Sequence, residues 1–197
     1  MPRPIADAAK VLAFNQIEAM NMETASRNYF ELFGLPPRFS IDLGTLENAF
    51  RRLQGELHPD RHVSNPEMQR RIALQLSTTV NDAYRTLRHP TSRAQCLIDM
   101  AEQPEAKNFG STVPPAFLMA QMEWREAIES ACAAQDVLEL EALARRLRSE
   151  MALQEKYLAE ALDTRNDFHG AAMKVNELRF YERLRSEIDD ALDHLDY

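Results

Sequence analysis

Apolar side chains recur along this chain at steps of three and four residues, and nowhere do they form the strict alternation that is typical of a half-buried strand. Only five of the 197 residues are glycines, so few positions favour the tight turns that join short strands. The period of the apolar positions therefore predicts an all-α fold. The length is sufficient for one ordinary domain or two small ones, each with a modest core.

Two amphipathic helices are predicted in the first half of the chain. The first follows Asp42, a suitable N-cap, and its apolar stripe consists of Leu43, Leu46, Phe50, Leu53 and Leu57. The second begins near Pro66, and its stripe consists of Ile72, Leu76, Val80, Ala83 and Leu87. The two helices should form an antiparallel hairpin. A shorter helix from Tyr29 to Leu32, which Gly34 stops, would complete a three-helix core.

The tripeptide His58-Pro59-Asp60 lies between these two helices and should form an exposed turn. Pro59 cannot continue a helix and disfavours helical geometry at His58, so the preceding helix should end near Leu57. Asp60 can hold the turn through hydrogen bonds to nearby backbone groups. The turn would present an imidazole and a carboxylate on a rigid corner, which makes it a candidate contact site.

The second half of the chain is predicted to form a separate helical domain. Residues 102–113 break the helical pattern and are typical of a linker, and Pro115 suits the start of the next helix. Three helices are expected, over about Pro115 to Ala133, Val137 to Asn166 and Phe168 to Leu195. Their short connections predict an antiparallel three-helix bundle. The predicted division is an N-terminal extension over 1–26, a first domain over 27–101, the linker, and the bundle over 114–197.

The helix that begins at Pro115 carries more apolar residues than one core stripe requires. Its core stripe is predicted to consist of Phe117, Ala120, Trp124, Ile128 and Ala131. A second apolar group, which consists of Leu118, Met119 and Met122, lies well away from that stripe. The same side of the helix carries Glu123, Glu126 and Glu129. An apolar patch with a carboxylate rim indicates a protein-binding surface, and methionines adapt well to a partner. The alternative is that this group packs against the first domain or a second copy of the chain.

Charge is distributed unevenly. Residues 27–101 contain ten basic and eight acidic side chains, whereas residues 102–197 contain eleven and twenty. The net charge of the whole chain is negative, which argues against a nucleic-acid partner, because such a partner requires a basic surface facing its phosphates. The excess of basic residues over 27–101 instead suits an acidic protein partner.

Other functional classes find little support in the sequence. Cys96 and Cys132 are isolated, so they indicate neither a metal site nor a disulfide framework, and a reducing cytoplasm fits. His58 and His62 have a spacing that zinc ligands often show, but Pro59 breaks the helix that would align them. No nucleophile is tied to His58 by a motif, so an enzyme is not expected. No run of 18 apolar residues occurs, which excludes a membrane span on length.

Three stretches of the sequence resemble a J domain, and more narrowly the J-type co-chaperone of iron–sulfur cluster assembly, the HscB family. The stretches are Asn28-Tyr29-Phe30-Glu31-Leu32-Phe33-Gly34-Leu35-Pro36, Leu57-His58-Pro59-Asp60-Arg61, and Asn81-Asp82-Ala83-Tyr84-Arg85-Thr86-Leu87 with His89-Pro90. The resemblance covers roughly Asn28 to the C-terminus. It implies an N-terminal J domain followed by a C-terminal three-helix bundle that binds a scaffold protein.

The resemblance implies two partners and a role for each group of residues. A DnaK-type chaperone ATPase of the iron–sulfur assembly system (HscA-like) would bind His58, Pro59 and Asp60 together with Arg51, Arg52 and Arg61. An iron–sulfur cluster scaffold protein (IscU-like) would bind Leu118, Met119, Met122, Glu123, Glu126 and Phe180. The helical angle of Phe180, at the edge of its stripe, predicts partial exposure. Ser130 stands where some relatives carry an acid, so this sequence departs from the family pattern at that position of the acidic rim.

The implied function is that of an adaptor that stimulates its partner's ATP hydrolysis and itself holds no cofactor. ATP belongs to the chaperone and the cluster belongs to the scaffold, because two cysteines are too few to hold one. Two alternatives stay open at this stage. A general J protein would bind unfolded clients through a broad apolar groove, and a purely structural helical adaptor would tolerate replacement of His58.

Overall fold

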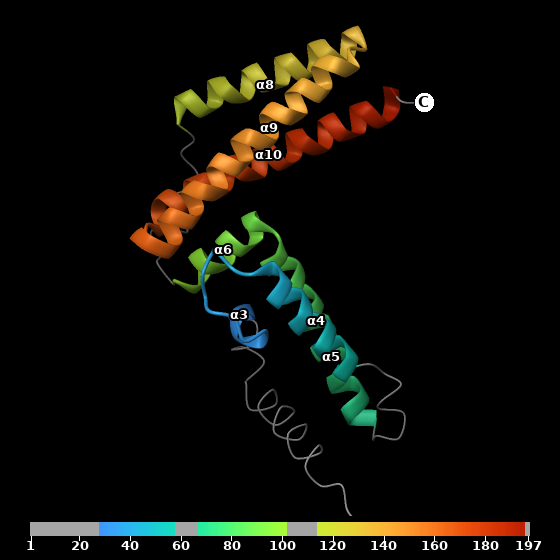
Figure 1. Cartoon of the computed structure of the whole chain (residues 1–197), viewed down its shortest axis with the longest axis vertical. Helices are drawn as coiled ribbons and strands as arrows, with labels where there is room; N and C mark the ends of the chain where they lie inside the picture. Colours follow the sequence, from blue (N-terminus) through green and yellow to red (C-terminus); the bar gives the residue numbers. More distant parts are fainter. Residues whose placement is uncertain (1–27, 58–66, 102–113, 196–197) are drawn as a thin grey trace, which may run out of the picture. The chain divides into compact units, whose positions relative to one another are not determined.

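The computed structural model describes residues 28–57, 67–101 and 114–195 (Figure 1). All elements in these ranges are helices and none is a strand, so the predicted all-α class is confirmed. The described chain divides into two compact units. Residues 28–37 and 41–88 form the first unit, and residues 38–40 and 89–195 form the second.

The first unit contains α3 (Tyr29–Leu32), α4 (Leu43–Leu57) and α5 (Glu67–Arg88). The side chains of Gln54 and Asn81 are hydrogen-bonded at 3.3 Å, and the rings of Phe50 and Tyr84 stack with centroids 4.0 Å apart. Residue numbers rise along one helix as they fall along the other, so α4 and α5 are antiparallel, as predicted. The buried side chains of this unit are Phe30, Phe33, Leu35, Leu46, Ala49, Leu53, Val80, Ala83 and Leu87.

The start of α4 confirms Asp42 as its N-cap. The backbone N–H groups of Gly44 and Thr45 both donate to the Asp42 carboxylate at 3.1 Å. The Thr45 hydroxyl also donates to this carboxylate, and together with these N–H groups it holds the pKa of Asp42 below its usual range. One prediction for α4 is wrong: Leu43 is 49% exposed, because it lies in the first turn and not over the core.

The second unit contains α6 (Pro90–Met100), α8 (Pro115–Ala134), α9 (Val137–Glu160) and α10 (Phe168–Leu195). The two predicted turns are confirmed, because Gln135 and Asn166 adopt left-handed backbone conformations with φ of 54° and 53°. The helix predicted to reach Asn166 ends at Glu160 and continues as a π-helical turn, η3 (Ala161–Arg165). Helix α6 was not expected as a separate element, and it clusters with the second unit. The predicted domain boundaries stay a prediction.

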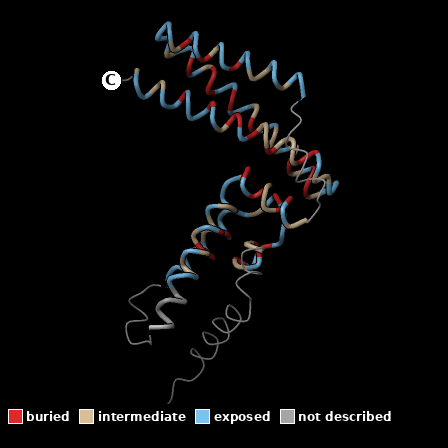
Figure 2. Tube along the Cα trace, turned by 180° about the vertical axis from the view of Figure 1, so that it is seen from behind, coloured by how far each residue is buried: buried red, intermediate tan, exposed pale blue. Residues whose placement is uncertain are grey.

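Helices α9 and α10 pack along their length and form most of the core of the second unit. Figure 2 shows buried and exposed positions alternating around both helices, which is the amphipathic pattern expected from the sequence. Helix α8 joins this pair through a narrow buried stripe of Trp124, Ile128 and Ala131. The Arg146 guanidinium of α9 lies 4.5 Å from the Trp124 ring centroid, so a cation–π contact supports the stripe. The predicted stripe members Phe117 and Ala120 are only half-buried.

Residues 38–40 belong to the second unit because of contacts with residues far along the chain. The N–H groups of Phe39 and Ser40 donate to the Asp163 carboxylate at 2.6 Å and 2.9 Å. The guanidinium of Arg93 lies 4.8 Å from the centroid of the Phe39 ring. Burial lowers the pKa of Arg93 from its ordinary value, against the opposing effect of the nearby Glu155 and Asp163 carboxylates.

Phe180 of α10 is 2% exposed, so the prediction of partial exposure is wrong. The Phe117 ring of α8 lies edge-on to it, with centroids 5.5 Å apart, and also packs edge-on against Tyr181 at 6.1 Å. The helical angle gave the position of Phe180 on α10 correctly but carried no information about a ring contributed by another helix. Phe180 is therefore a core residue beneath the start of α8.

We expect Phe180→Ala to lower the free energy of unfolding by about 3–5 kcal/mol, because it empties a fully packed aromatic position. Leu153→Ala is the control, since Leu153 is 57% exposed on α9 and its truncation should change stability by less than about 0.5 kcal/mol. Urea unfolding followed by circular dichroism measures both. A loss below 1 kcal/mol for Phe180→Ala would contradict the burial of this ring.

We expect Gly170→Ala to destabilise the protein although alanine is the better helix former. A Cβ atom at Gly170 would lie 2.3 Å from Asp167 Oδ2 and 2.8 Å from the Tyr157 hydroxyl oxygen. Asp167 would have to leave its position as the cap of α10, where it accepts a hydrogen bond from the Gly170 N–H at 2.8 Å. The net loss should be about 1–2 kcal/mol after the gain in helix propensity.

The matched control is Gly55→Ala in α4, where a Cβ would meet nothing within 4 Å. Here alanine should stabilise the helix by about 0.5–1 kcal/mol. Thermal unfolding of both variants tests the pair. Equal effects of the two substitutions would show that the contacts around Gly170 do not restrict its side chain.

Candidate functional site

The predicted chaperone-binding group is described only in part. His58, Pro59, Asp60 and Arg61 lie outside the described residues, so their proposed contacts stay predictions. Helix α4 ends at Leu57, where the proline was expected to stop it. The remaining members of the group, Arg51 and Arg52, are both exposed on the last two turns of α4.

Arg51 forms an ion pair with Glu47 one turn earlier on the helix. The Arg51 side chain is 73% exposed and that of Glu47 is 46% exposed, and an ion pair so open to solvent contributes little to stability. The Arg51 guanidinium can therefore exchange Glu47 for an acidic group of a partner at low cost. Arg52 makes no ion pair within the part of the chain that the structure describes.

The predicted scaffold-binding residues of α8 gather on one exposed side of that helix. Leu118, Met119 and Met122 are 47%, 65% and 71% exposed, and we call these three residues the α8 strip. Residues three or four positions apart are neighbours on a helix surface, so Met122 lies beside both of the others. Three of the seven large apolar side chains that are exposed among the described residues therefore lie within five positions.

An acidic rim adjoins the α8 strip. Glu123, Glu126 and Glu129 are all exposed and follow one another along the helix at three-residue steps. Ser130 is exposed as well, so a neutral side chain stands at that end of the rim. The rim suits basic groups that surround an apolar contact on a partner. The structure thus brings together five of the six predicted scaffold-binding residues, and Phe180 alone lies beneath the surface.

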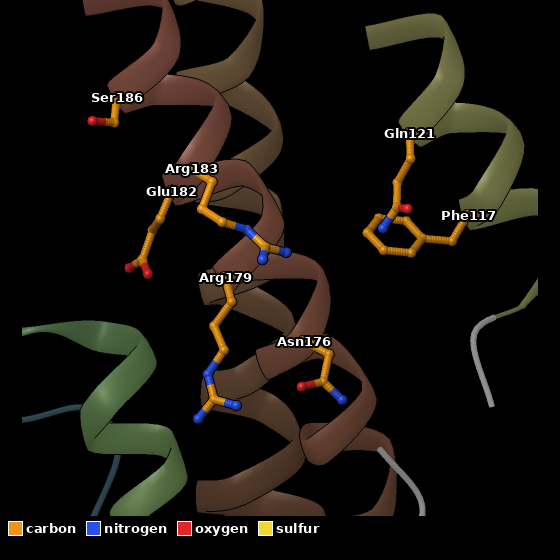
Figure 3. A pocket seen from close by; sticks show the side chains of 7 residues that line it. All are labelled: Phe117, Gln121, Asn176, Arg179, Glu182, Arg183 and Ser186. Atoms are coloured by element: carbon orange, nitrogen blue, oxygen red, sulfur yellow. The ribbon is translucent and has the colours of Figure 1, made fainter. Parts of the chain in front are cut away.

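A groove of about 620 Å³ lies between the start of α8 and the middle of α10. Its lining consists of Phe117, Gln121, Asn176, Arg179, Glu182, Arg183 and Ser186 (Figure 3). Phe117 extends from α8 toward α10, the Gln121 side chain ends beside the Phe117 ring, and Arg183 extends from α10 on the side that faces them. Sequence reasoning missed this groove because it treated Phe117 as core. The four-residue step between Arg179 and Arg183 was a usable signal, since it places two guanidinium groups on one face of α10.

The described residues show no metal centre, and one of the two cysteine thiols, that of Cys96, is held in its unreactive protonated form. No group of three or more His, Cys, Asp or Glu side chains in these ranges could hold a metal ion. Burial, with a smaller effect of the nearby Asp99 carboxylate, raises the pKa of Cys96 to about 11, so its thiol stays protonated near neutral pH. Within the same ranges, no helix has both the length and the apolar character needed to cross a membrane.

Comparison with known proteins supports the resemblance seen in the sequence. Residues 113–189 match the family model of the HSCB C-terminal oligomerisation domain. A co-chaperone protein HscB homolog of Azoarcus sp. is 48% identical over 86% of this chain and 96% of its own length. The homolog of Burkholderia thailandensis is 41% identical over 89% of this chain and its full length.

Two solved structures show the same fold. The chaperone HscB from Vibrio cholerae has a TM-score of 0.76 and 34% identity, and the match covers 85% of this chain and 99% of that one. The human co-chaperone protein HscB has a TM-score of 0.74 over 82% of this chain and 80% of its own, and its 24% identity supports the fold alone. These similarities extend over both units, so this chain belongs to the HscB family of co-chaperones.

Proposed function

We propose that this protein is a co-chaperone of iron–sulfur cluster assembly that brings a cluster scaffold protein (IscU-like) to a DnaK-type chaperone ATPase (HscA-like). The observation that carries the proposal is the exposed α8 strip with its acidic rim, in a chain that belongs to the HscB family. A compact apolar strip of this kind suits one folded partner. A protein for unfolded clients would present a broad apolar groove instead.

Two groups of residues divide the work. The turn His58-Pro59-Asp60, with Arg51, Arg52 and Arg61, would contact the chaperone and stimulate its ATP hydrolysis. The α8 strip with Glu123 and Glu126 would hold the scaffold. Tethering the scaffold raises its effective concentration at the chaperone, so delivery requires no chemistry by this chain. The proposed location of this work is the cytoplasm.

The ATPase end is tested by steady-state ATP hydrolysis of the cognate DnaK-type chaperone with scaffold present. We expect the wild-type protein to stimulate hydrolysis and His58→Gln to lose most of this stimulation, because the imidazole of the turn is removed while scaffold binding is retained. His89→Gln is the control, since His89 is exposed and belongs to neither proposed surface. Equal stimulation by the wild type and His58→Gln would favour the structural adaptor.

The scaffold end is tested by calorimetric titration of the cluster-free scaffold into the double variant Leu118→Ala/Met119→Ala. We expect the affinity to fall by at least about fivefold, equivalent to about 1 kcal/mol, because truncated apolar anchors bury less surface. The matched control is Leu138→Ala/Leu153→Ala, which removes two leucines that are 75% and 57% exposed on α9. A similar loss in both double variants would show that the α8 strip is not the specific contact.

A further inference from the structure

We infer that the groove between α8 and α10 is a second part of the scaffold-binding surface, in which Arg179 and Arg183 bind a carboxylate of the scaffold beside the Phe117 ring. This inference rests on the proposed function and extends it. It assigns the groove an occupant of defined chemistry, an acidic side chain or chain end of the scaffold protein.

The first support is the continuity of the groove with the α8 strip. Phe117 and Gln121 line the groove, and Leu118 and Met122, each the next residue along, belong to the strip. One helix therefore carries two adjoining surfaces over the same two turns. A folded partner that covers the strip reaches the groove wall without a change in this chain.

The second support is the charge of the groove wall on α10. The wall holds two guanidinium groups in a region of the chain where acidic residues outnumber basic ones by twenty to eleven. Arg179 donates from Nη2 to the Gln95 side-chain oxygen at 3.0 Å, so its partner there is neutral. Arg183 makes no ion pair with any residue in the described ranges, and both arginines are exposed.

The one acid of the groove wall is already engaged. Glu182 accepts a hydrogen bond from the Thr91 hydroxyl at 2.6 Å and extends in Figure 3 away from Phe117 and Gln121. Its carboxylate therefore does not satisfy the guanidinium group of Arg183. The planar donors of arginine suit a carboxylate, which can accept two parallel hydrogen bonds from one guanidinium.

The third support is the opposite charge of the neighbouring rim. Glu123 and Glu126 lie on α8 beyond the strip, whereas Arg179 and Arg183 lie on α10 across the groove. A partner must then present basic groups to one side of the apolar contact and an acidic group to the other. Two charges of opposite sign fix the orientation of the bound partner, and the wrong orientation would place like charges together.

This arrangement also gives Phe180 a role that fits its burial. Phe180 supports the Phe117 ring from below, with centroids 5.5 Å apart, and Phe117 forms part of the groove surface. Phe180 is thus a positioning residue for the surface, and Phe117 is the aromatic ring that the partner reaches.

The test is calorimetric titration of the cluster-free scaffold protein into Arg183→Glu and into Arg179→Glu/Arg183→Glu. We expect Arg183→Glu to weaken binding about tenfold, equivalent to about 1.4 kcal/mol, and the double variant to weaken it further. The salt dependence of the affinity should also become smaller, because fewer charge pairs are screened. Arg148→Glu is the control, since it makes the same charge change at an exposed position of α9 and should leave binding within about twofold.

The outcomes separate this inference from the proposed function. If the wild-type protein binds no scaffold, the proposed function fails and the groove loses its occupant. If the wild type binds and Arg183→Glu binds equally well, the groove inference alone is overturned. Restoration of binding to Arg183→Glu by one Asp→Lys or Glu→Lys change in the scaffold would support it directly, and a scan of the scaffold's acidic residues without any restoration would overturn it.

Discussion

The surface that the second unit exposes depends on how few residues of α8 are buried. Trp124, Ile128 and Ala131 attach this helix to α9 and α10, and the Arg146 guanidinium covers the Trp124 ring at 4.5 Å. Because the aromatic anchor is large, a narrow stripe is enough to hold twenty residues of helix. The other side chains of α8 are half-buried or exposed. Attachment through a few strong contacts is therefore what makes the exposed strip possible.

The features that sequence could predict were those decided within one helix. The apolar period located the antiparallel pair α4 and α5, and Asp42 and Asn166 marked a helix start and a turn because their side chains suit these backbone positions. The burial of Phe180 could not be predicted in this way. It depends on the Phe117 ring, which comes from a helix some 60 residues earlier, and periodicity describes each helix without its neighbours.

The candidate site also has one part that a single helix reveals and one part that depends on two helices. The α8 strip was predictable because a helix with two apolar faces needs a partner for the second one. The groove was missed, since its walls belong to two helices. The four-residue step between Arg179 and Arg183 places both on one face of α10, but it does not tell which helix lies opposite them. The π-helical turn at Ala161–Arg165 was equally hidden, because no residue type signals a change from α to π geometry.

Asp163 determines how early during synthesis the segment before α4 can take its folded position. Its carboxylate binds the N–H groups of Phe39 and Ser40, which precede it by 124 and 123 residues. At about 5–20 residues per second, the ribosome takes roughly 6–25 s to supply this acceptor after Phe39 has been added. Throughout that interval the two N–H groups can be satisfied only by water or by other parts of the nascent chain. The segment before α4 therefore reaches its final place only after all of α9 and the π-helical turn as far as Asp163 have been synthesised.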